Sequence, residues 1–165
     1  FIPLFNRVIY PAFDRFWPLT PLRKISIGLF LTVPAFVLPA WFEARLDAGE
    51  SVSIVWQLAA YIIMTAAEVL VSITALEFSY TQAPRRMKSV VMGAFLMSVA
   101  LGNLFTAGVN FFIQNPDGTS KLEGPSYYLF FAGTMAVTAL VFVPVAMWFK
   151  ERTYIQEETP AGAVE

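Results

Sequence analysis

Residues 55–76 read VWQLAAYIIMTAAEVLVSITAL, an apolar run interrupted by a single carboxylic acid, Glu68. An α-helix needs about 20 mainly apolar residues to cross the hydrocarbon core of a bilayer, and this run is long enough. It lacks the alternation of apolar and polar residues that a strand of an outer-membrane barrel shows. The run therefore predicts a transmembrane helix.

Glu68 shares one face of this helix with the polar side chains around it. Steps of four and three residues from Tyr61 lead to Thr65, Glu68 and Ser72, which an α-helix aligns in one stripe. A carboxylate in hydrocarbon costs several kcal/mol, so acids at this depth usually face a polar interior. The stripe predicts the wall of a water-filled cavity. The alternative is a packing face on which hydroxyl groups bind a neighbouring helix.

The composition of the whole chain agrees with a membrane protein. Its 165 residues are 57% hydrophobic and only 14% charged, and the mean hydropathy is +0.61. A soluble domain of this size needs fewer apolar residues. The net charge of -1 argues against a nucleic-acid partner. The chain has no Cys and no His, so it predicts no catalytic residues, no metal site and no resident cofactor.

Charged and turn-forming residues divide the chain into apolar segments of membrane-spanning length. The predicted elements are the end of a helix at 1–17, transmembrane helices at 25–42, 52–83, 86–114 and 125–150, and a disordered cytoplasmic tail at 153–165. Pro34 and Pro39 predict bends in the first complete helix. The chain starts without Met in an apolar stretch, so we expect a fragment of a longer polytopic protein.

Lysine and arginine are distributed unequally between the two sides of these helices. Nine of the eleven lie before the first complete helix, between the second and third, or after the fourth. Only Arg45 and Lys121 lie in the other two connections. By the positive-inside rule the side with nine is cytoplasmic. The sequence thus predicts a multi-pass protein of the cell membrane with a cytoplasmic C-terminus.

Longer motifs resemble a known family. Residues 68–84 read EVLVSITALEFSYTQAP, and MKSV at 87–90 and VALGN at 99–103 follow. This pattern resembles the tenth and eleventh transmembrane helices of the proton-dependent oligopeptide transporters, a branch of the major facilitator superfamily. Residues 2–11 resemble the end of the family's eighth helix, and residues 22–28 the start of its ninth. By this numbering the segment 125–150 is the twelfth helix.

The resemblance implies an all-α membrane protein, of which this chain forms part of the C-terminal six-helix bundle of a major facilitator fold. It implies proton-coupled symport of di- and tripeptides by alternating access, with protons as the coupling ion. The family's E-x-x-E-R motif and the N-terminal bundle are missing from this chain and would be its partner in the bilayer. The connection between the ninth and tenth helices is short, which resembles bacterial members and implies a bacterial inner membrane.

The resemblance also implies roles for individual residues. Glu68 corresponds to the family's partner for the peptide amino terminus, with Tyr61 nearby, and Ser72 extends the same stripe. Phe95 and Ser98 lie one turn apart on the following helix, so we expect them to form a wall for peptide side chains. The family often has Trp at the position of Phe95. Ordinary helix packing remains the alternative for both residues.

A second group of residues lies towards the predicted cytoplasmic end. Glu77 follows Glu68 by about 13 Å along the helix axis, at about 1.5 Å per residue. We predict that Glu77 forms a gate with basic residues of the following turn, among them Lys88, and that Phe78 and Tyr80 plug the pore beside it. A solvated acid at the membrane interface is the alternative interpretation of Glu77.

Other classes of function explain the sequence less well. A nitrate or other small-anion carrier of the same broad family is the first alternative, but a deep carboxylate repels anions and attracts an ammonium group. A membrane scaffold subunit that does not transport would have similar hydropathy without needing this polar stripe. An intramembrane enzyme would need paired acids, a metal site or a nucleophile with a base, and none is present.

Overall fold

The structure is a computed structural model, and it describes residues 19–115 and 119–149 together with Pro3, Arg7 and Pro11. Most of the predicted helix end at 1–17 and the whole predicted tail at 153–165 lie outside these residues, as does residue 150. The four longest helical segments are all long and apolar enough to cross a membrane. An all-helical membrane fold follows from them.

The described elements follow one another as helices with short connections. They are α3 (Pro21–Asp47), α4 (Ile54–Glu68), the π-helical turn η2 (Val69–Ile73), α5 (Thr74–Gln82), the 3-10 turn η3 (Arg85–Met87), α6 (Lys88–Ile113) and α7 (Pro125–Trp148). α4, η2 and α5 are continuous and form a single span of 29 residues, Ile54–Gln82. The second predicted helix, 52–83, is therefore interrupted by a π turn that periodicity did not indicate.

α3 extends beyond the predicted segment 25–42 at both ends. Pro21 occupies the first turn, where its missing N–H removes no helical hydrogen bond. The helix continues through Pro34 and Pro39 and ends at Asp47. The chain then turns at Gly49, whose φ of 78° is a backbone conformation that side-chain-bearing residues rarely adopt. The sequence had underestimated how far the helix reaches into its polar flanks.

α3 is the central helix of a packed layer. It contacts α7 and also α4 and η2, whereas α4 and α7 have no extensive contact with each other in the described residues. Ile25 and Leu29 of α3 pack with Ala139 of α7, which is 0% exposed. Val71 and Ala75 of the second span join this cluster. The apolar core therefore lies where three spans meet.

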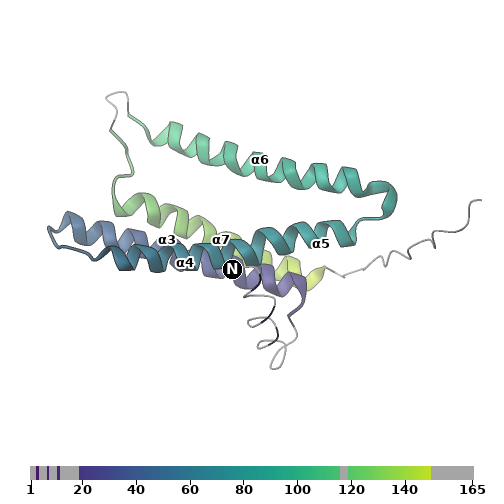
Figure 1. Cartoon of the computed structure of the whole chain (residues 1–165). Helices are drawn as coiled ribbons and strands as arrows, with labels where there is room; N and C mark the ends of the chain where they lie inside the picture. Colours follow the sequence, from purple (N-terminus) through teal and green to yellow (C-terminus); the bar gives the residue numbers. More distant parts are fainter. Residues whose placement is uncertain (1–2, 4–6, 8–10, 12–18, 116–118, 150–165) are drawn as a thin grey trace, which may run out of the picture.

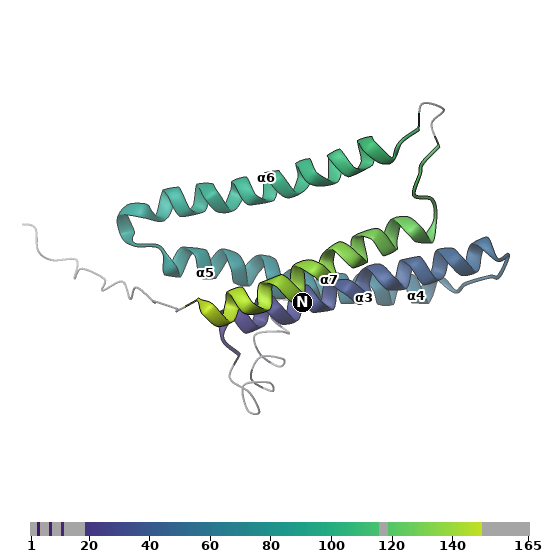
Figure 2. The ribbon, with the colours of Figure 1, turned by 180° about the vertical axis from the view of Figure 1, so that it is seen from behind.

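α6 lies apart from this layer. Figures 1 and 2 show it running alongside the other helices, joined to them by the turn after α5 at one end and by the connection to α7 at the other. In the described residues its substantial contacts are with α5 and η3, and none of its residues is buried. The α3–α4 turn and the α6–α7 connection lie at one end of the molecule, and the α5–α6 turn lies at the other (Figure 1).

Candidate functional site

Glu68 is the middle residue of the span Ile54–Gln82, a segment long and apolar enough to cross a membrane. Its side chain is exposed in this chain. The buried residues of the span are Ala60 and Ala67 in α4, with Val69, Leu70 and Thr74 further along. These face the packed layer, because α4 and η2 contact α3. The carboxylate therefore does not belong to the surface that holds the described helices together.

The π turn begins directly after Glu68 and changes the direction of every later side chain in the span. Glu77 lies nine residues after Glu68, which in a regular α-helix is 2.5 turns and would put the two acids on opposite faces. A π turn accommodates one extra residue, which leaves about 2.2 turns and separates the acids by about 80° around the axis. Both side chains are accordingly exposed.

The predicted polar stripe retains its exposure through this irregular region. Tyr61 is 63% exposed, and Ser72, inside the π turn, is exposed as well. Thr65 is partly buried, and its hydroxyl donates a hydrogen bond of 2.8 Å to the carbonyl oxygen of Tyr61. The stripe therefore lies on a face of α4 and η2 that the layer leaves open.

Phe95 and Ser98 lie on α6 and are not packed together with Glu68. Phe95 is partly buried and Ser98 exposed, and the Ser98 hydroxyl donates 2.7 Å to the carbonyl oxygen of Phe95. α6 has no extensive contact with α4 in the part of the chain that the structure describes. The two groups of predicted binding residues therefore lie on separate helices.

The predicted gating residues lie around the α5–α6 turn, with contacts that the sequence did not indicate. The Lys88 ammonium nitrogen lies 3.8 Å from the centre of the Tyr80 ring, a cation–π contact. Phe78 meets Phe149 edge to face, with 5.7 Å between ring centres, and so connects α5 to the end of α7. Glu77 forms no ion pair among the described residues, where Arg45–Glu50 is the sole salt bridge.

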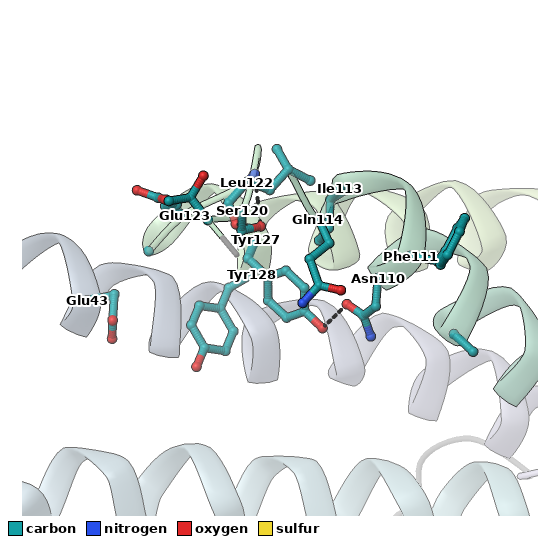
Figure 3. Close-up of a pocket in the computed structure, with 13 residues that line it drawn as sticks. Glu43, Asn110, Phe111, Ile113, Gln114, Ser120, Leu122, Glu123, Tyr127 and Tyr128 are labelled. Carbon is teal, nitrogen blue, oxygen red and sulfur yellow. Dashed lines mark hydrogen bonds between the residues drawn. The ribbon is translucent and has the colours of Figure 1, made fainter. Parts of the chain in front are cut away.

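Two cavities lie at the opposite end of the molecule. The larger, of about 710 Å³, lies between the end of α6, the start of α7 and Glu43 of α3. Figure 3 shows Tyr127 pointing towards Asn110 inside it, where the tyrosine hydroxyl donates a hydrogen bond of 3.0 Å to the amide oxygen. None of the predicted binding residues lines this cavity.

The smaller cavity, of about 320 Å³, includes one predicted residue, Tyr61. Gln57 and Met64 of α4 line it too, facing Phe36 and Pro39 of α3. Glu68 lines neither cavity. The carboxylate is therefore exposed in this chain and lies outside both cavities.

Comparison with known proteins identifies the family. The sequence model of the POT family (PTR2) matches residues 1–129, which is more than half of the chain. This chain belongs to the POT family. The matched region contains α3, α4, η2, α5 and α6, with Glu68 and every other predicted binding or gating residue.

One similar protein is named as a peptide transporter and another as a solute carrier. The chain is 30% identical over 148 residues to "Peptide transporter PTR2" of Saccharomyces cerevisiae, covering 82% of this chain and 25% of that protein. It is 38% identical over 112 residues to "Solute carrier family 15 member 2" of Rattus norvegicus, covering 68% of this chain and 14% of that protein. The chain thus spans a quarter or less of these relatives.

Solved POT family structures have the same fold. An auto-inhibited POT family peptide transporter superposes with a TM-score of 0.85 at 31% identity, covering 95% of this chain and 32% of that one. The POT family transporter PepTSo superposes with a TM-score of 0.78 at 36% identity, covering 88% and 30% respectively. These likenesses confirm the predicted all-helical fold of the major facilitator type. The relatives are transporters and not enzymes, as the sequence predicted for this chain.

Sequence reasoning missed two features of this POT family chain. Glu43 and Tyr128 line both cavities, but neither belongs to a motif or a periodic stripe that would have indicated it. Gly28 had a weak signal, since a glycine inside an apolar helix often marks a close helix contact. The structure shows that contact directly: a Cβ at Gly28 would lie 2.7 Å from Val71 and 2.8 Å from Leu70.

Proposed function

We propose that this chain forms part of the C-terminal bundle of a proton-coupled transporter of di- and tripeptides. Alternating access moves the substrate, and protons are the coupling ion. The observation that carries this proposal is the exposed carboxylate of Glu68 at the middle of a membrane span, in a chain whose relatives are named as peptide transporters. The remaining helices, including the N-terminal bundle, complete the protein.

The chemistry of peptides explains why an acid at this place suits them. Every short peptide carries an ammonium group and a carboxylate, whereas its side chains vary. A transporter that accepts many peptides therefore binds the constant charges tightly and the side chains loosely. Glu68 attracts the ammonium group, and the attraction is stronger in a partly dry cavity than in bulk water. The same charge disfavours nitrate and other anions.

The other residues of the site act together with helices that complete the protein. Tyr61 and Ser72 extend the polar face around Glu68, and Phe95 and Ser98 contact the peptide side chains from α6. Glu77, Phe78, Tyr80 and Lys88 form the cytoplasmic gate. The chain lies in a cell membrane of the bacterial inner-membrane type, with its C-terminus in the cytoplasm, as the distribution of basic residues supports.

The proposal is tested by replacing Glu68 with Gln in the complete transporter. Loss of one partner of a desolvated, hydrogen-bonded charge pair costs about 2–5 kcal/mol of binding. We expect Glu68→Gln to lose this amount for a free dipeptide and much less for its N-acetyl form, which has no ammonium group. Binding of both ligands to both proteins measures the coupling between Glu68 and the amino group.

Glu77→Gln is the matched control, because it removes the same charge from the same span. It should preserve the preference for the free amino group and change the transport rate more than the affinity, since a gate alters the populations of conformations. Equal losses of both ligands in Glu68→Gln would show that Glu68 does not recognise the amino terminus. If Glu77→Gln weakened binding of the free dipeptide but not of its N-acetyl form, Glu77 and not Glu68 would be the residue that recognises the amino group.

A further inference from the structure

α3 packs tightly against the second span at Gly28. A Cβ atom there would lie 2.7 Å from Cγ2 of Val71, 2.8 Å from Cβ of Leu70 and 3.1 Å from the carbonyl oxygen of Ala67. Gly28 is buried, and its own carbonyl accepts a hydrogen bond of 2.9 Å from the Thr32 hydroxyl. A side chain of any size is therefore excluded from this point.

The residues that contact Gly28 lie on both sides of Glu68 in the sequence. Ala67 precedes Glu68, and Leu70 and Val71 belong to the π turn that begins immediately after it. π turns occur often at functional sites, where they redirect neighbouring side chains. The direction of Glu68 is thus set by a stretch of backbone that rests against α3 on both sides of the acid.

We propose that Gly28 is a positioning residue for Glu68. By allowing α3 to contact the backbone around the π turn, it holds the carboxylate at the depth and angle at which it meets the peptide ammonium group. This inference rests on the proposed function of Glu68. Gly28 touches no substrate, and its effect passes through its contacts with Ala67, Leu70 and Val71.

An alanine at Gly28 forces a movement that side-chain rotation does not relieve. The position of Leu70 Cβ is fixed by the backbone, and Val71 is β-branched and has few rotamers. Ala67 contributes a backbone oxygen. Either α3 withdraws or the π turn rearranges, and both changes alter the position of Glu68 relative to α3, because Glu68 lies between these contacts in the sequence.

The position of residue 68 can be measured without any substrate. This chain has no cysteine, so Glu68→Cys supplies its single thiol, and cysteines in the rest of the transporter are replaced by serine beforehand. The complete transporter carrying Glu68→Cys is treated with a charged thiol reagent in two backgrounds, Gly28 and Gly28→Ala. We expect the modification rate to change several-fold in Gly28→Ala. Gly133→Ala is the matched control, because no atom lies within 4 Å of a Cβ built there, and its rate should equal that of the parent.

Ligand discrimination gives the second readout. In Gly28→Ala with Glu68 intact, the preference for a free dipeptide over its N-acetyl form should fall about tenfold, within the loss of about 100-fold that a 1 Å misplacement can cause. The loss should appear in KM more than in kcat, and Gly133→Ala should keep the preference. Gly28→Ala with Val71→Ala removes the closest contact and should restore part of it. This double variant carries the test if Gly28→Ala does not reach the membrane.

The outcomes separate this inference from the proposed function. One outcome is that Glu68→Gln abolishes the preference for a free dipeptide over its N-acetyl form while Gly28→Ala keeps both this preference and the parental modification rate of the thiol at residue 68. In that case the positioning role of Gly28 is wrong and the proposed function of Glu68 stands. If Gly28→Ala weakens both ligands equally at an unchanged thiol rate, Gly28 supports only the fold. If Glu68→Gln keeps the preference, the proposed function is wrong, and the thiol rates alone decide whether Gly28 positions residue 68.

Discussion

Hydroxyl groups and the acid differ in how their polarity is satisfied within the spans. Thr32, Thr65 and Ser98 each donate to a carbonyl oxygen of the preceding turn, so their hydrogen bonds are complete within one helix. Glu68 has no such partner among the described residues. An ionised carboxylate accepts hydrogen bonds but does not donate them, so it cannot form a hydrogen bond with the carbonyl oxygens of its helix. This difference separates the acid from the hydroxyls, whose hydrogen bonds are satisfied within their own helix.

The contact between Tyr80 and Lys88 leads to a prediction at the scale of single residues. Tyr80→Leu removes the ring face, Lys88→Gln removes the cation, and the double variant removes both. A cation–π contact at a partly exposed site contributes about 0.5–1 kcal/mol. We expect this coupling in a double-mutant cycle on the thermal stability of the purified transporter. Tyr80→Phe keeps the ring and should behave like the parent. Additive effects would show that the contact does not stabilise the α5–α6 turn.

At the scale of elements, α3 and α7 form the closest pair, and small residues make their approach possible. Ala132 and Ala139 are the buried residues of α7. Phe36 of α3 stacks on Phe131, with 6.1 Å between ring centres. Membrane helices gain no hydrophobic free energy by associating in lipid, so close packing of small residues supplies much of the attraction. The register between the two helices depends on these alanines.

Enlarging Ala139 should therefore weaken the layer. Ala139→Leu places extra carbon atoms in a site that is 0% exposed, beside Ile25 and Leu29. Overpacking of this kind costs about 1–3 kcal/mol, and we expect a lower thermal unfolding temperature for the transporter. Val137→Leu is the control, since Val137 is 61% exposed. An unchanged temperature in Ala139→Leu would mean that α7 shifts to accept the larger side chain.

For the whole molecule, the ends of the spans agree with one orientation in the membrane. Trp41 and Trp56 lie near the α3–α4 turn with 6.2 Å between ring centres, and the Arg45 guanidinium lies 4.7 Å from the Trp41 ring. Aromatic residues of this kind favour the membrane interface. The α6–α7 connection lies at the same end, and the basic α5–α6 turn lies at the other (Figure 1). The unequal distribution of Lys and Arg therefore maps onto two physical ends.

Cysteine labelling tests this orientation. Asp47→Cys and Arg86→Cys place thiols at exposed positions at opposite ends of the layer. An impermeant reagent added outside intact cells should label Asp47→Cys alone, because the basic end is retained in the cytoplasm. Permeabilised cells provide the control, in which both positions should react. Labelling of Arg86→Cys alone in intact cells would reverse the topology.

Composition and period determined the class of this protein and singled out Glu68 as a candidate binding residue. Hydrophobic runs near the bilayer thickness have few structural solutions, so four spans and their alternating ends follow from the sequence. The spacing of Tyr61, Thr65 and Glu68 predicted that these side chains share one face, since all three lie in the regular turns of α4. The motif at 68–84 predicted the family.

Only the tertiary structure decided how the second span turns after Glu68. The formation of a π turn depends on packing against another helix. Residues 69–73 contain no proline or glycine that would indicate the turn in the sequence. The turn lies against α3, where a Cβ at Gly28 would be 2.7 Å from Val71 and 2.8 Å from Leu70. The contact of Lys88 with Tyr80 was likewise decided by how α5 and α6 meet. Such contacts join separate segments, so their geometry depends on how the helices pack in three dimensions.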